Sequence, residues 1–160
     1  MTETSEVMNL YTAVENNSAA DVTRCLKEAG VDIEMTGGVK LSTPLILATS
    51  LYSVNNEIAM LLLANKANPF AQNKDGDTAL GMAAFWCNIE LVKTIVDMSE
   101  DVKPLTCNRN GYSAYTQTEM MAYVCRANPI KLEKFNKIAE LLQPYHTEED
   151  MSDSEPDENE

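Results

Sequence analysis

The stretch Asp75-Gly-Asp-Thr-Ala-Leu-Gly-Met-Ala-Ala84 decides the fold, because altered copies of it recur at a fixed distance along the chain. The copies are Ser42-Thr-Pro-Leu-Ile-Leu-Ala48 and Asn110-Gly-Tyr-Ser-Ala-Tyr115. Matching positions are 35 residues apart, as in the series Leu10, Leu45, Leu80 and Tyr115. A period of this size indicates a stack of small units, each of which completes its core against a neighbour.

The residues around each landmark predict where a helix begins. Thr43 and Thr78 precede apolar residues and can cap a helix through their hydroxyl groups. Pro44 would then occupy a first turn, where its missing N–H breaks no hydrogen bond. Gly76 and Gly111, each after Asp or Asn, supply the positive φ that a tight hairpin needs. Each unit is therefore predicted to contain a hairpin followed by a helix.

These motifs resemble the ankyrin repeat, in which a Gly-containing hairpin leads into Thr-Pro-Leu-His-x-Ala at the start of a first helix. The stretches 57–63 and 90–96 have the apolar spacing of the second helices, with Ile58, Leu61 and Leu62 in one and Leu91, Thr94 and Ile95 in the other. The resemblance covers residues 6–143 and implies an all-α solenoid of helix–turn–helix units joined by β-hairpin-like loops.

The resemblance divides the chain into four units, at about 6–36, 37–71, 72–106 and 107–143, after an N-terminal arm of residues 1–5. Unit two has two extra residues between its helices, within 51–56. Unit four departs most from the pattern, because its second helix, Lys131 to Leu142, begins about a dozen residues late. Its first helix is therefore predicted to extend through Met120, Met121 and Tyr123.

The charge of the chain is concentrated at one end. The formal net charge is −13, and residues 147–160 contain eight acidic residues without Lys or Arg, which leaves −5 on the remainder. Such a segment cannot bury enough apolar surface to offset its ordering entropy, so residues 144–160 are predicted to be a disordered tail. It either keeps the protein in solution or attracts a basic surface of a partner. The charge argues against nucleic acid as a partner.

Composition sets further limits. The 160 residues, 44% of them hydrophobic, support one domain. No apolar run approaches the roughly 18 residues of a membrane span, and the acidic start 1–6 lacks the features of a signal peptide. We therefore expect a cytoplasmic protein without membrane contact. The sequence indicates no oligomeric state.

The sequence offers little for catalysis or metal binding. The four cysteines, Cys25, Cys87, Cys107 and Cys125, lack the short spacing of zinc or redox motifs, and the single histidine, His146, lies at the start of the tail. No Gly-rich phosphate loop is present. We expect reduced cysteines that pack as small apolar residues, with no cofactor and no metal.

The resemblance implies a binding surface at the hairpin tips and along the first helices. The residues predicted to form it are Leu51, Lys74, Asp75, Asp77, Phe85, Trp86, Arg109, Asn110, Tyr112, Met120 and Met121. Leu51, Phe85, Trp86, Met120 and Met121 would lie along one concave stripe, and such apolar residues are typical of interface centres. In the alternative, Trp86 folds back against the turn between its helices, or unit four covers the stripe.

These features predict a non-catalytic protein that binds another protein, and the acidic charge suits a partner with a basic surface. A small acidic ankyrin protein resembles inhibitors or immunity proteins that neutralise a toxin or an enzyme. The alternative within the same class is an adaptor or regulator in a larger assembly. Enzymatic activity is the remaining, less favoured alternative.

Overall fold

The computed structural model describes residues 9–50, 56–98 and 107–145. The helices in these ranges are α1 (Leu10–Glu15), α2 (Ala19–Leu26), α3 (Pro44–Ser50), α4 (Asn56–Ala64), α5 (Ala79–Phe85), α6 (Ile89–Met98), α7 (Ala114–Val124), α8 (Pro129–Leu142) and the short 3₁₀ helix η1 (Gln143–Tyr145). Outside these ranges lie the predicted N-terminal arm, residues 51–55 of the predicted insertion and residues 146–160 of the predicted tail. Pro144 and Tyr145, the first two residues of the predicted tail, belong to η1.

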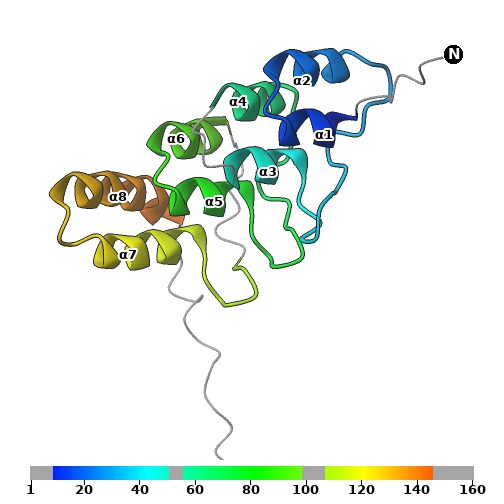
Figure 1. The fold of residues 1–160 in the computed structure, drawn as a ribbon. Coiled ribbons are helices and arrows are strands. Elements are labelled where there is room, and N and C mark those ends of the chain that lie inside the picture. Colours follow the sequence, from blue (N-terminus) through cyan, green and yellow to red (C-terminus); the bar gives the residue numbers. More distant parts are fainter. Residues whose placement is uncertain (1–8, 51–55, 99–106, 146–160) are drawn as a thin grey trace, which may run out of the picture.

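The helices form two rows (Figure 1). The first helices α1, α3, α5 and α7 make one row, and their partners α2, α4, α6 and α8 make the other. Each helix packs on its partner and on the same helix of the next pair. The described residues contain no strand, only a single β-bridge between Gly37 and Ser42. The prediction of an all-α solenoid of helix pairs is confirmed.

Polar side chains start the helices where the sequence predicts. The Thr78 hydroxyl accepts a hydrogen bond from the Gly81 amide at 3.0 Å, and the Thr43 hydroxyl accepts one from the Ile46 amide at 3.3 Å. Pro44 is the first residue of α3. These groups satisfy backbone donors that a helix cannot pair internally.

The core is a continuous layer between the two rows. Its fully buried members include Ile58 and Leu62 from α4 and Leu91 and Ile95 from α6, while Leu61 is half-buried. Small side chains, such as the fully buried Ala84, let the paired helices approach closely. The apolar spacing therefore identified the buried face of the second helices.

Consecutive hairpins are joined by backbone hydrogen bonds. The Lys74 amide donates to the Lys40 carbonyl at 2.8 Å, and the Arg109 amide donates to the Asp75 carbonyl at 2.9 Å. Gly76 has φ +78°, and a Cβ atom there would lie 2.9 Å from the Arg109 nitrogen. The close stacking of the hairpins thus depends on a residue without a side chain.

Replacing Gly76 with alanine is expected to cost more stability than replacing Gly111, although both have positive φ. A Cβ at Gly111 meets nothing within 4 Å, so Gly111→Ala should cost only the backbone strain, about 1 kcal/mol. Gly76→Ala adds a clash with the next hairpin, worth roughly 1–3 kcal/mol more. Denaturant unfolding of both variants measures the difference. Equal losses would contradict the stacking argument.

The fourth helix pair is longer than the third. Helix α7 has 11 residues where α5 has 7, and α8 has 14 where α6 has 10. The predicted extension of the first helix through Tyr123 is confirmed. The second helix begins at Pro129, two residues before the predicted Lys131, because the Asn128 side chain accepts a hydrogen bond from the Lys131 amide at 3.1 Å. The fourth pair therefore overhangs the turn of the third.

Candidate functional site

The predicted stripe begins at the end of α5. Phe85 is the last residue of that helix and Trp86 is its C-cap, and the two rings meet edge to face at 5.2 Å and 88°. Trp86 is 41% exposed and Phe85 is 37% exposed. On α7, Met120 is 47% exposed and Met121 is half-buried. These side chains are partly open to solvent, so the fourth pair does not bury them.

A cavity of about 300 Å³ lies between α5, α7 and the neighbouring hairpins. Six of the predicted site residues line it: Asp77, Phe85, Asn110, Tyr112, Met120 and Met121. Met82, Asn108 and Gln117 complete its lining. The structure thus brings together predicted residues from the third and fourth helix pairs.

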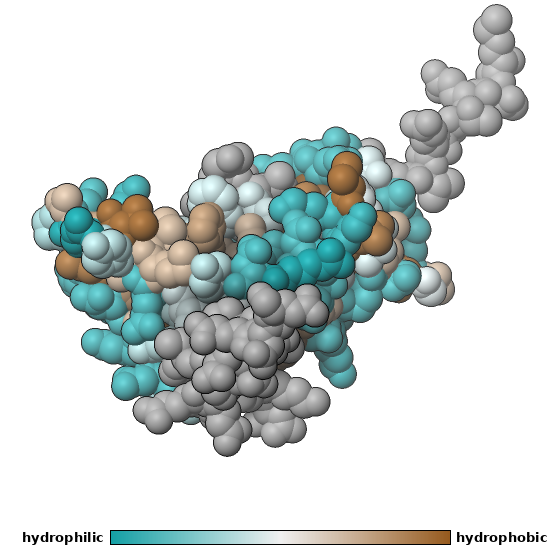
Figure 2. Space-filling model, turned by 90° about the horizontal axis from the view of Figure 1, so that it is seen from below, coloured by the Kyte–Doolittle hydropathy of each residue, from teal (hydrophilic) through white to brown (hydrophobic). Residues whose placement is uncertain are grey.

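A second cavity, of about 330 Å³, continues the first toward α1. Trp86 lines it together with Leu47, Tyr11 and the hairpin around Lys40. Met82 and Asp77 border both cavities, so the two adjoin as one groove along the first helices. We call this combined surface the first-helix groove. Figure 2, a view from below, shows paler brown side chains between the α7–α8 end and the middle of the stack.

Other predicted residues lie on the hairpins and outside the two cavities. Asp75 forms an ion pair with Lys40 at 2.8 Å, and this contact lowers the pKa of the Asp75 carboxyl and raises the pKa of the Lys40 amine. Lys74 and Arg109 are exposed. The hairpins carry the basic residues Lys40, Lys74 and Arg109 beside the acidic Asp75 and Asp77. The charges on the rim of the groove therefore nearly cancel. Predicted Leu51 lies outside the described residues.

Sequence reasoning missed three residues that shape the groove. Met82 sits at its centre, on the exposed side of α5. The Asn73 side-chain oxygen accepts hydrogen bonds from the Asp75 and Asp77 amides, each at 2.9 Å, and Asn108 repeats this arrangement in the next hairpin. Asn73 and Asn108 are 35 residues apart, so the repeat period was a signal that could have identified them.

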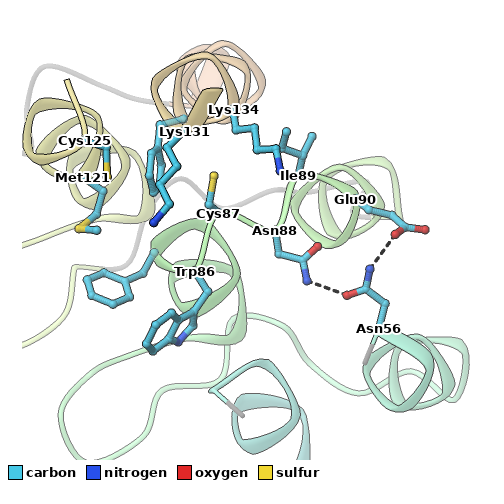
Figure 3. A pocket seen from close by; sticks show the side chains of 12 residues that line it. Asn56, Trp86, Cys87, Asn88, Ile89, Glu90, Met121, Cys125, Lys131 and Lys134 are labelled. Carbon is cyan, nitrogen blue, oxygen red and sulfur yellow. Dashed lines mark hydrogen bonds between the residues drawn. The ribbon is translucent and has the colours of Figure 1, made fainter. Parts of the chain in front are cut away.

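A third cavity, of about 650 Å³, lies on another side of the third helix pair. It is bounded by the α5–α6 turn and by the overhanging ends of α7 and α8 (Figure 3). We call it the turn cavity. Its lining is Asn56, Phe85, Trp86, Cys87, Asn88, Ile89, Glu90, Met121, Cys125, Lys131, Lys134 and Phe135. At its edge, Asn88 donates to Asn56 at 2.6 Å, and Asn56 donates to Glu90 at 2.7 Å.

Cys87 lies on the α5–α6 turn, where it lines the turn cavity, and its φ is +62°. Burial raises the pKa of its thiol, while the nearby charges of Lys134 and Lys131 act in the opposite direction. A thiol with a raised pKa is mostly protonated at neutral pH and is a poor nucleophile. The arrangement therefore does not favour a cysteine nucleophile.

The described residues show few other features that suggest catalysis or metal binding. Among them, no three His, Cys, Asp or Glu side chains gather closely enough to hold a metal ion. Cys25 is buried, and Cys87, Cys107 and Cys125 are half-buried. No helix in the described part of the chain has the length and apolarity that a membrane span requires.

Comparison with known proteins identifies the repeats. A family model described as ankyrin repeats, in three copies, matches residues 10–106. A fowlpox virus protein described as an ankyrin repeat protein is 24% identical over 127 residues, which is 79% of this chain and 27% of the relative. The chain thus spans about a quarter of the length of that relative.

Proposed function

Because the chain belongs to the ankyrin repeat family, whose repeats mediate protein–protein interaction, we propose that the first-helix groove is its binding surface. One observation supports this most directly. Partly exposed Phe85, Trp86 and Met120 border adjoining cavities lined by residues of all four helix pairs. Aromatic and Met side chains of this kind form the centres of interfaces, since they bury large areas and adapt to a partner.

The groove indicates the chemistry of the partner's contact. Its floor is apolar, and the charges on its rim nearly cancel. A protruding apolar side chain from the partner, surrounded by polar groups, would match this surface. Residues 147–160 contribute −8 of the net charge of −13, so attraction to a basic partner would act mainly from there at longer range.

Within protein binding, we propose a neutralising role, in which this chain occludes the working surface of a toxin or an enzyme. The net charge of −13 supports this proposal, because an acidic protein associates quickly with a basic surface at low salt. The rival proposal is an adaptor in a larger assembly. The two differ in what happens to the partner, because only a neutralising protein abolishes the partner's activity.

The test compares capture of a partner by the full chain and by two double variants. Phe85→Ala with Met120→Ala removes apolar area from the groove. Met98→Ala with Ile130→Ala removes exposed apolar area from α6 and α8 in the other row and serves as the matched control. We expect a specific partner to be lost with the groove variant and retained with the control.

Two outcomes would contradict these proposals. Equal retention of the partner by both double variants would exclude the first-helix groove as the interface. A bound partner that keeps its full activity, or several unrelated partners captured through the groove, would replace the neutralising role with that of an adaptor.

A further inference from the structure

The turn cavity is a second surface with the features of a binding site. Its volume of about 650 Å³ is in the range of ligand-binding sites, and aromatic, Met and Cys side chains form much of its wall. The cavity exists because α7 and α8 extend past the α5–α6 turn. It therefore depends on the elongated fourth pair.

Two lysines give this cavity its charge. Lys131 and Lys134 reach from the first turns of α8 toward Cys87 (Figure 3). Within the described ranges neither lysine forms an ion pair, whereas Lys137 on the same helix pairs with Glu133 at 3.1 Å. The only acidic residue in the lining is Glu90, which accepts a hydrogen bond from Asn56. The cavity is thus a basic site in an acidic protein.

The matching ligand is an acidic segment that carries an apolar side chain. Carboxylates would pair with the two lysines next to an apolar wall, where charges attract more strongly than in bulk water. The apolar side chain would fill part of the cavity. A free acidic peptide is repelled by a protein of net charge −13. The same segment within the chain is supplied at an effective concentration of about millimolar.

Residues 147–160 have this composition. They include eight acidic residues and no basic ones, and Met151 lies between Asp150 and Asp153. Methionine is unbranched and adapts to irregular apolar space. The segment follows Tyr145, the last described residue, directly after α8 and η1. It therefore follows closely in sequence the helix that carries the two lysines.

The stretch of chain from Tyr145 to Met151 is long enough to reach back from the end of η1 to the turn cavity. Lys134 precedes Tyr145 by 11 positions, about 17 Å along a helix. Met151 follows Tyr145 by six positions, which span about 20 Å when extended. Met151 and its acidic neighbours can therefore return along α8 to the turn cavity.

We propose that the turn cavity binds the acidic segment 147–160 of the same chain, with carboxylates on Lys131 and Lys134 and Met151 in the apolar part. The segment would then lie beside Trp86, which borders both the turn cavity and the first-helix groove. A partner that contacts Trp86 would compete with the segment. The inference is independent of the proposed neutralising role.

The chain contains its own probe, because Trp86 is its single tryptophan. Acrylamide quenching of Trp86 fluorescence in the full chain reports how far the cavity is covered. If carboxylates hold the segment in place, quenching should increase about twofold between ~0.01 M and ~1 M salt, since the Debye length falls from about 30 to 3 Å. A quenching constant that does not change with salt would overturn the proposal.

Charge reversal locates the contact. Lys131→Glu with Lys134→Glu should raise quenching at low salt to the high-salt level and remove the salt response. The matched control is Lys27→Glu with Lys93→Glu, which makes the same charge change at exposed lysines outside the cavity. It should keep the salt response. The same effect in both double variants would show that overall charge, and not the cavity, is responsible.

A third variant tests the segment itself and does not touch the folded core. Replacing its eight carboxylates by amides in the full chain should also expose Trp86 at low salt. An unchanged salt response would exclude residues 147–160 as the occupant. Because this variant leaves all described residues intact, it decides the matter even if charge reversal on α8 impairs folding.

Two further measurements establish the pairing. Combining Lys131→Glu and Lys134→Glu with Asp150→Lys and Asp153→Lys should restore protection of Trp86, and failure to restore it in a folded protein would argue against direct contact. Protection within one molecule should not depend on protein concentration. Protection that rises with concentration would instead place the segment of a second copy in the cavity.

Discussion

Replacing Leu62 with alanine is expected to lower the free energy of unfolding by about 2 to 5 kcal/mol. Leu62 lies on α4 and is 0% exposed, between helices that pack on both sides of it. Removing its side chain leaves a cavity that a stack of short helices can fill only by shifting whole pairs. Denaturant unfolding measures the loss.

The neighbouring Leu61 is the control for this prediction. It is half-buried on the same helix, so Leu61→Ala removes the same atoms from a site that is already in contact with solvent. Its cost should be clearly smaller than that of Leu62→Ala. Equal costs for the two variants would show that α4 buries a different face from the one described.

Replacing Trp86 with alanine is expected to weaken partner binding by about 2 kcal/mol or more, close to 30-fold in Kd. Trp86 adjoins the first-helix groove at the boundary between the second and third helix pairs. Central aromatic residues carry a large share of the binding energy of an interface. The loss of stability should be smaller, because the ring is 41% exposed. Titration calorimetry and a thermal melt of the variant measure both effects.

The expected loss of affinity depends on the position of Trp86 in the groove, and two sets of control variants test this dependence. Ile130→Ala removes a more exposed apolar side chain on α8 and should leave affinity unchanged. Lys74→Ala and Arg109→Ala, on the rim, should mainly change the association rate and its salt dependence. If Trp86→Ala keeps full affinity, or if its melt collapses enough to explain the loss, Trp86 is a structural residue.

Much of the fold was predictable because the local signals agree with the tertiary structure. Thr78 starts a helix through its hydroxyl, Gly76 and Gly111 have positive φ, and Leu62 and Ile95 lie on the buried faces that their spacing indicates. Each of these features depends on contacts within one unit or between adjacent units. A sequence motif that recurs at a fixed period is therefore a direct sign of such contacts.

The sites were predictable only in part. The repeat pattern brought Phe85, Trp86 and Met120 to one face, and the structure places them around the first-helix groove. The turn cavity was not predicted, because it depends on how far α8 overhangs the third pair. That overhang follows from the lengths of two helices, with Lys131 and Lys134 brought over Cys87 from 44 and 47 positions away. No local sequence pattern reports a contact of this kind.

The hydrogen bonds between neighbouring pairs also have a consequence for folding kinetics. Side-chain hydrogen bonds that join one pair to the next link residues only 31 to 35 positions apart. Contacts between distant parts of the chain are few in such a stack, and proteins of low contact order fold fast. A nucleus can form at any two adjacent pairs and grow outward in both directions. Within the described stack, the first and fourth pairs each contact one other pair, so we expect them to fold after the two middle pairs and to exchange their amide hydrogens sooner.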